Sequence, residues 1–131
     1  MPIRIVLAES NAVLRAAFRE YLHRHGQDIE IVGETGDADE AVRQALANKP
    51  DVVVLDLGLR ERTGWESAKR IHEAAPESRI CLVSLGPTGL SPEQMKEHGV
   101  CGVLEKHRLA TSLVEMIREC AAGLCQEGAG V

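Results

Sequence analysis

The sequence lacks the features that mark membrane proteins, secreted proteins and nucleic-acid-binding modules. No apolar run approaches the roughly 20 residues that a membrane-spanning helix needs, and the N-terminal residues contain no charged leader with a cleavage site. There is no basic run and no patch that combines basic with aromatic residues. Asp and Glu total 20 against 15 for Lys and Arg, and a net charge of −5 disfavours contact with nucleic-acid phosphates. We therefore predict a cytoplasmic protein with no membrane segment that binds nucleic acid poorly on its own.

Cysteine and histidine are few and show no metal-binding spacing. No two cysteines form a Cys-x-x-Cys motif, and no histidine lies where it would complete a metal site with them. We predict that the cysteines are small buried side chains rather than redox or metal groups; they are Cys81, Cys101, Cys120 and Cys125. Three histidines fit exposed helix or loop positions, namely His72, His98 and His107.

The composition is that of one folded domain. The chain has 131 residues, of which 44% are hydrophobic and 27% are charged, with no long polar tract. A chain of this length can bury a substantial core. We assign residues 1–124 to one domain, and the small, glycine-rich residues 125–131 to a flexible tail or the start of a linker.

Short apolar runs alternate along the chain with stretches whose apolar residues recur at helical spacing. The runs predict strands over residues 3–8, 29–33, 51–57, 80–84 and 101–104. A helical pattern follows each run, and the five helices are expected near residues 14–26, 37–50, 65–76, 91–99 and 109–124. Five β/α units predict an α/β fold, (βα)5, with a doubly wound, parallel five-stranded sheet of the flavodoxin-like type.

Helix start signals support three of these boundaries. Asp37 is placed to cap the second helix, with Glu40 three residues later. The segment Ser91-Pro92-Glu93-Gln94 combines a capping Ser, a Pro at the first helical position and a Gln where a capping box requires it. Ser10 is predicted to be the N-cap of the first helix.

Polar side chains stand at the carboxyl ends of four predicted strands. A sheet core has no structural use for such residues, least of all for an acid that ends the apolar run Val-Val-Val-Leu. In chain order the residues are Glu9 and Ser10, Asp56, Ser84, and Lys106. Because parallel strands of an open α/β sheet present their carboxyl ends at one edge, we expect these side chains to meet in a functional site there.

With these motifs in place, the chain resembles the receiver domain of two-component response regulators, of the NarL/LuxR type. The likeness covers residues 3–123 and includes the segment Lys-Pro-Asp-Val-Val-Val-Leu-Asp-Leu that ends at Leu57. The resemblance implies that Asp56 accepts a phosphoryl group from a histidine kinase. It implies further that Ser84 binds a phosphoryl oxygen and that Lys106 pairs with the phosphoaspartate.

The same resemblance implies a cofactor and partners. Mg²⁺ would be held by Glu9, Asp56 and the Gly58 carbonyl, and weakly by Ser10; oxygen ligands of this kind suit Mg²⁺. Phosphorylation would switch the face formed by the fourth helix, fifth strand and fifth helix, and so control homodimerisation or an output partner in transcription. DNA would be reached only through an output domain, which residues 125–131 do not supply, so we expect either a stand-alone receiver or a fragment of a longer DNA-binding regulator. A signalling protein rather than an enzyme is expected.

Several positions depart from the family pattern. Ser10 stands where a second acid normally binds the metal directly, so Mg²⁺ binding should be weakened. Leu85 replaces a small residue beside the phosphoryl pocket and is expected to narrow access to it. Val103 replaces the aromatic residue that moves with the switch, and Arg60 replaces a proline. Signalling is therefore expected to run through the mobile-looking segment 86–91.

Two alternatives remain open beside a phosphorylatable receiver. The chain can be an atypical pseudo-receiver, a protein-interaction or ligand-sensing module in which Asp56 and Lys106 form a buried ion pair. An FMN or nucleotide binder of the flavodoxin type is disfavoured, because no glycine-rich phosphate loop follows the first strand and only Phe18, Tyr21 and Trp65 are available to stack a flavin.

Overall fold

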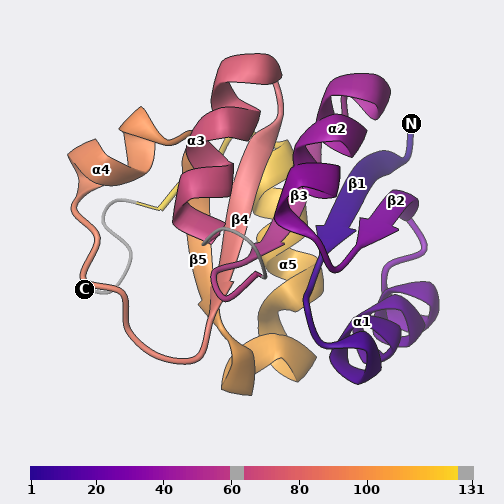
Figure 1. Cartoon of the computed structure of the whole chain (residues 1–131). Helices are drawn as coiled ribbons and strands as arrows, with labels where there is room; N and C mark the ends of the chain where they lie inside the picture. Colours follow the sequence, from indigo (N-terminus) through magenta and orange to yellow (C-terminus); the bar gives the residue numbers. More distant parts are fainter. Residues whose placement is uncertain (60–63, 127–131) are drawn as a thin grey trace.

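The computed structural model describes residues 1–59 and 64–126, which form one parallel sheet covered by helices on both faces (Figure 1). Within these residues the sheet has five strands in the order β2-β1-β3-β4-β5, and all neighbours are parallel. The strands are β1 (Ile3–Ala8), β2 (Ile29–Thr35), β3 (Val52–Asp56), β4 (Arg79–Ser84) and β5 (Val100–Glu105). The predicted α/β fold and doubly wound topology are confirmed.

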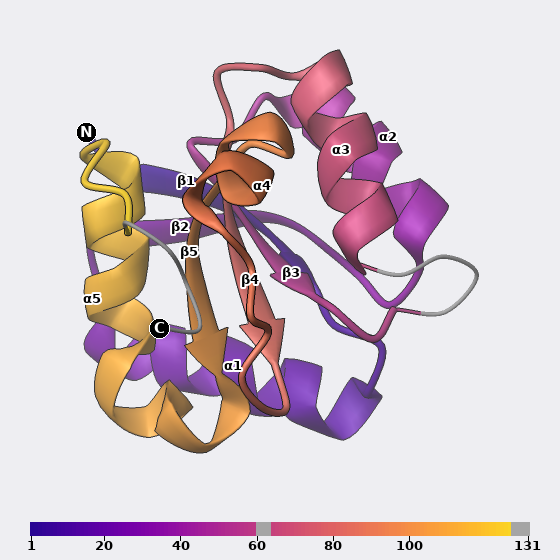
Figure 2. The ribbon, with the colours of Figure 1, turned by 90° about the vertical axis from the view of Figure 1, so that its left-hand side faces the viewer.

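The helices divide between the two faces of the sheet, as Figure 2 shows. They are α1 (Ala12–His25), α2 (Ala38–Asn48), α3 (Gly64–Ala74), α4 (Pro92–Glu97) and α5 (Leu109–Ala121), with a 3₁₀ turn η1 (Lys106–Arg108) before α5. One apolar cluster joins α1 and α5 to the sheet and includes Phe18 and Ile117. The other joins α2, α3 and α4 to the opposite face and includes Ala41, Ile71 and Met95. Burial of both faces explains why β3 is apolar throughout its length until Asp56.

The helix starts follow the predicted signals at two of three positions. The Asp37 carboxylate accepts a hydrogen bond from the backbone N–H of Glu40 at 2.9 Å. At α4 the Ser91 hydroxyl and the Gln94 side chain form the reciprocal capping box. The prediction for Ser10 was wrong: Asn11 caps α1, and its side chain accepts from the N–H groups of two residues in the first turn.

The cysteines divide into two pairs that differ in chemistry. Cys81 and Cys120 are free and buried, as predicted. Cys101 and Cys125 form a disulfide, so the prediction that all four are merely small buried side chains was wrong for this pair. Their separation of 24 residues gave no motif to recognise, because only the return of the chain after α5 brings the two sulfurs together.

The boundary predicted at residue 124 stays a prediction. Of the seven residues beyond it, the structure describes Cys125 and Gln126, and both are bonded to β5. In the described part of the chain, no helix has the length and apolar character required to cross a membrane.

Gly64 positions the start of α3 directly against the carboxyl end of β3. A Cβ atom at this position would meet the carbonyl oxygen of Asp56 and would lie 2.5 Å from the Cα of Leu57. Both neighbours are backbone atoms, which cannot move aside without displacing Asp56. The absence of a side chain at Gly64 therefore helps to set the position of the acid.

We expect Gly64→Ala to lower the free energy of unfolding by about 1–3 kcal/mol, because it overpacks a rigid contact. Gly86→Ala is the matched control, since a Cβ there has no atom within 4 Å apart from those of Gly86 and its two chain neighbours. Urea unfolding followed by circular dichroism measures both. Equal stability of the two variants would contradict the close packing inferred around Gly64.

Candidate functional site

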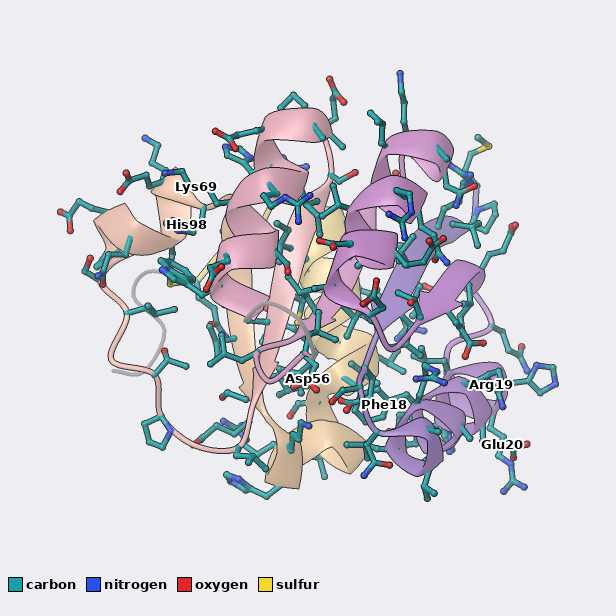
Figure 3. All side chains as sticks on the ribbon, in the orientation of Figure 1. Phe18, Arg19, Glu20, Asp56, Lys69 and His98 are labelled. Carbon is teal, nitrogen blue, oxygen red and sulfur yellow. A yellow bond between two sulfur atoms is a disulfide. The ribbon has the colours of Figure 1, made fainter. Side chains whose placement is uncertain are left out.

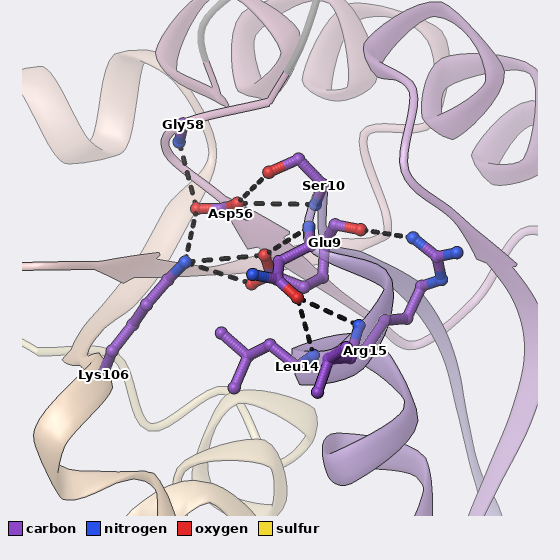
Figure 4. Close-up of polar contacts among 9 residues, drawn as sticks. Glu9, Ser10, Leu14, Arg15, Asp56, Gly58 and Lys106 are labelled. Atoms are coloured by element: carbon purple, nitrogen blue, oxygen red, sulfur yellow. Dashed lines mark hydrogen bonds and ion pairs between the residues drawn. The ribbon is translucent and has the colours of Figure 1, made fainter.

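The predicted site residues meet at the carboxyl edge of the sheet, around an open pocket of about 990 Å³. Glu9 and Ser10 come from the end of β1, Asp56 from the end of β3, Ser84 from the end of β4 and Lys106 from the turn after β5. All five line the pocket. The convergence predicted from the strand ends is therefore present, and Figure 4 shows the polar contacts of Glu9, Ser10, Asp56 and Lys106.

Asp56 lies at the centre of these contacts with only 4% of its surface exposed. Its Oδ1 accepts a hydrogen bond from the backbone N–H of Gly58 at 3.0 Å and lies 3.4 Å from the Lys106 ammonium. Its Oδ2 accepts from the Ser10 hydroxyl at 3.0 Å. Both carboxylate oxygens thus face donors, an environment that favours the ionised form.

Glu9 is the second acid of the pocket and is fully buried. Its Oε1 lies 3.3 Å from the Lys106 ammonium, and its Oε2 accepts from the backbone N–H of Asn11 at 3.0 Å. Arg15 does not pair with this carboxylate but donates to the Glu9 backbone carbonyl at 2.6 Å (Figure 4). Among the described residues, Glu9 Oε1 has the ion pair with Lys106 but no hydrogen bond.

The pKa values of the two acids shift in opposite directions. For Glu9, burial raises the pKa above its ordinary value, and the neighbouring Asp56 raises it further, against the lowering effects of Asn11 and Lys106. For Asp56, burial also acts to raise the pKa. The Gly58 N–H, Glu9, Lys106 and Ser10 together outweigh burial and lower the pKa below its ordinary value. Asp56 is therefore the acid whose ionised form the pocket favours.

Ser84 and Leu85 occupy the pocket in ways that the sequence did not indicate. Ser84 is buried, and its hydroxyl donates to the Gly86 carbonyl at 2.7 Å. Leu85 lines the rim, but 85% of its surface is exposed, so the side chain does not fill the pocket and the expected narrowing of access is not seen. The position of Arg60 lies outside the described residues.

The oxygen atoms around Asp56 are of the type that Mg²⁺ prefers. Two carboxyl groups and the Ser10 hydroxyl line the pocket, and one ammonium, that of Lys106, faces both carboxyl groups. Within the described ranges no group of three or more His, Cys, Asp or Glu side chains is placed to hold a metal. The ligand atoms are therefore of the type that suits Mg²⁺, but the pocket has two acids where a strong site would have three.

Trp65 adds a feature that sequence reasoning missed. It lines the pocket, and its indole stacks on the His98 ring with centroids 3.6 Å apart and planes inclined by 12°. The prediction that His72 and His98 are exposed was wrong: both are partly buried, whereas His107 is exposed as predicted. His98 is the C-cap of α4 and lies between α4 and α3 (Figure 3). Burial lowers its pKa below the ordinary value for histidine.

Comparison with known proteins identifies relatives over nearly the whole chain. The family model described as response regulator receiver domain matches residues 5–118. The uncharacterized transcriptional regulatory protein YxjL of Bacillus subtilis is 31% identical over 121 residues, which are 92% of this chain and 55% of that protein. The transcriptional regulatory protein PdtaR of Mycobacterium tuberculosis is 32% identical over 117 residues, 89% of this chain and 56% of that protein. The chain thus spans about half the length of these relatives.

Comparison with solved structures agrees with the match to the receiver domain family. A two-component response regulator of the LuxR family from Aurantimonas sp. SI85-9A1 superposes with a TM-score of 0.86 at 27% identity, covering 95% of this chain and 89% of that one. The predicted resemblance to receiver domains of the NarL/LuxR type is confirmed.

Glu9→Gln should raise the free energy of unfolding at pH 7 by more than roughly 0.5 kcal/mol, the usual limit for a surface substitution. The folded pKa of Glu9 is raised, so its ionisation lowers stability as pH rises from 4.5 through the folded pKa. The extra stability of Glu9→Gln over the parent protein should therefore disappear as pH falls from above the folded pKa of Glu9 to below 4.5.

Urea unfolding between pH 4 and pH 8 tests this, with Glu30→Gln on the exposed part of β2 as the control. A Gln variant less stable than the parent at pH 7 would show that the attraction of Glu9 to Lys106 exceeds the cost of burying its charge.

Proposed function

The chain belongs to the response regulator receiver domain family, and on that basis we propose that Asp56 accepts a phosphoryl group from a histidine kinase. The observation that carries the proposal is the state of Asp56: a buried carboxylate with a lowered pKa at the end of a central strand, open to a pocket. In the transfer, a carboxylate oxygen of Asp56 attacks phosphorus, and the bond from phosphorus to the donor breaks. Catalysis of such a transfer consists largely of positioning and charge neutralisation.

Lys106 supplies positive charge from within the chain. Its ammonium lies 3.4 Å from Asp56 and 3.3 Å from Glu9, so it can follow charge that moves from the carboxylate to the phosphoryl oxygens. Receiver domains typically bind Mg²⁺, and here Glu9, Asp56, the Ser10 hydroxyl and the Gly58 carbonyl would hold it. When bound, Mg²⁺ would neutralise further negative charge on the phosphoryl group.

Ser84 would couple the phosphoryl group to the segment that follows β4. Its hydroxyl proton is engaged with the Gly86 carbonyl, so donation to a phosphoryl oxygen requires that this hydrogen bond break. The exchange would release Gly86 and the following residues up to α4 from β4. This agrees with the expectation that signalling runs through segment 86–91.

Trp65 provides a second route from the pocket to α4. Its indole both lines the pocket and stacks on His98, the residue that ends α4. Val103 has no ring with which to link the site to β5, whereas this stack already joins α3 to α4. We propose that a change in the pocket shifts the Trp65–His98 stack, and with it the face formed by α4, β5 and α5.

The output of that face is inferred from the relatives. YxjL and PdtaR are named as transcriptional regulatory proteins, and this chain spans about half of each. We propose that the switched face controls homodimerisation or an output partner in transcription, and that any contact with DNA is made by such an output domain.

A pseudo-receiver remains the alternative, and two contacts favour it. The Ser10 hydroxyl and the Lys106 ammonium already engage Asp56, and Ser10 removes one acid from the metal site. In that case the buried charges would have a structural role, and the pocket would serve a protein or ligand partner without phosphorylation.

Acetyl phosphate with Mg²⁺ should add one phosphoryl group to the protein, as measured by intact mass. Asp56→Asn should abolish the gain, because the amide is a far weaker nucleophile. Ser10→Asp should tighten Mg²⁺ binding by about tenfold or more, since it restores a charge worth at least about 1.4 kcal/mol.

Asp51→Asn is the matched control, because Asp51 precedes the same strand at its opposite end and is exposed. If the parent protein gains no mass while Ser10→Asp does, the pseudo-receiver is favoured. A gain that survives Asp56→Asn would refute the assignment of the phosphoacceptor.

Beryllofluoride with Mg²⁺ should change the fluorescence of the single tryptophan, Trp65, and the amide exchange of α4. His98→Ala should leave phosphorylation of Asp56 intact but reduce the response of α4, because the stack is lost. His107→Ala, an exposed histidine, is the control. An α4 response that is undiminished in His98→Ala would exclude this route.

A further inference from the structure

The outer edge of β5 is covered by the residues that follow α5. β5 is the last strand of the sheet, so one side of its backbone has no neighbouring strand in the described chain. Gln126 covers it: its backbone N–H donates to the Cys101 carbonyl at 2.7 Å, and its side-chain oxygen accepts from the Val103 N–H at 2.9 Å. Uncovered sheet edges are sites of unwanted strand pairing. Gln126 therefore acts as a local cap on this edge.

The disulfide fastens this cap to the strand. Cys101 lies where the register of β5 against β4 shifts: Ile80 pairs with Val100 and the next residue of β4 pairs with Gly102, which leaves Cys101 as the extra residue of a bulge. Cys125, which immediately precedes Gln126, forms the disulfide with Cys101. The closed loop contains η1 and α5, so a single covalent bond holds the end of α5, the cap and the strand edge together.

The two cysteines of the disulfide differ in exposure. Cys101 is only 2% exposed, whereas Cys125 is an exposed residue. The remaining cysteines, Cys81 and Cys120, are buried. Thiol–disulfide exchange requires access to one sulfur, and the exposed residue Cys125 is the side from which a soluble thiol would approach.

We propose that the Cys101–Cys125 disulfide is a redox modification site that takes a dithiol reductant and controls whether the cap stays on the edge of β5. A thiolate of the reductant attacks Sγ of Cys125, and the bond to Cys101 breaks. Cys101 leaves as a thiolate and takes up a proton. The second thiol of the reductant then displaces Cys125, so the protein disulfide gains two electrons and two protons and the reductant becomes a disulfide.

Reduction leaves the cap held by hydrogen bonds alone. Among the described residues, Gln126 forms two hydrogen bonds to β5 and a weak contact of its amide with the Met116 sulfur at 3.9 Å. Without the covalent bond, opening frees the Cys101 carbonyl and the Val103 N–H on the face assigned to output. Reduction of the Cys101–Cys125 disulfide would thus act on this face independently of phosphorylation of Asp56.

Counting thiols tests the chemistry. In the purified 131-residue protein, alkylation after denaturation without reductant should modify two cysteines, and after native treatment with dithiothreitol it should modify four. Peptide mapping should place the two new sites at Cys101 and Cys125. Four free thiols in the air-purified protein, or a bond that resists dithiothreitol until the protein is unfolded, would overturn the proposal.

Amide exchange tests the structural consequence. Reduction should speed exchange of the Val103 amide by about tenfold or more while leaving that of Ile5, in the middle of the sheet, unchanged. Cys125→Ser should show the fast exchange without reductant. Gln126→Ala should also speed exchange at Val103 while keeping the disulfide. Unchanged amide exchange at Val103 in reduced protein would show that the disulfide does not control whether Gln126 stays on the edge of β5, and would overturn the proposal.

Asp56→Asn separates this site from the phosphoacceptor. The variant should lose phosphorylation yet show the same thiol count and the same response of Val103 to reduction. A redox response lost in Asp56→Asn would contradict the independence of the two inputs, whereas loss of phosphorylation alone would leave the redox site in place.

Discussion

The site depends on one interaction, the contact of the Lys106 ammonium with two buried carboxylates. Lys106 lies within 3.5 Å of both Glu9 and Asp56, and it is the cation that allows two acids to share the carboxyl edge of an apolar sheet. Two acids that share one ammonium disfavour each other's ionisation, so their environments decide which of them ionises more readily. The backbone N–H of Gly58 and the Ser10 hydroxyl favour Asp56, while full burial disfavours Glu9. The chemistry proposed for the pocket follows from this asymmetry.

The sequence predicted the fold and most of the site because both depend on short-range patterns. Apolar runs that alternate with helical spacing determine a doubly wound sheet, and the topology then brings the strand ends to one edge. Asp56, Glu9, Ser84 and Lys106 were found for this reason. Ser10 was identified as a pocket residue but wrongly assigned as the helix cap, because Asn11, one residue later, has equal capping ability.

What the sequence did not predict depends on contacts between distant residues. The Trp65–His98 stack joins α3 to the end of α4, and the Cys101–Cys125 bond joins a strand bulge to the segment after α5. Neither pair has a characteristic spacing. Leu85 was expected to narrow the pocket from its size, yet its orientation toward solvent depends on the backbone after β4. In each case the sequence shows the residue type but not the direction in which its side chain points.

The pocket favours the ionised form of Asp56 and disfavours that of Glu9. Carbon-13 NMR of the side-chain carboxyls, followed from pH 2 to pH 8 and assigned with Asp56→Asn and Glu9→Gln, measures this directly. We predict that Asp56 titrates below its ordinary pKa of 3.8 and Glu9 above its ordinary 4.5. The reverse order, with Glu9 ionised first and Asp56 protonated near neutral pH, would contradict the account.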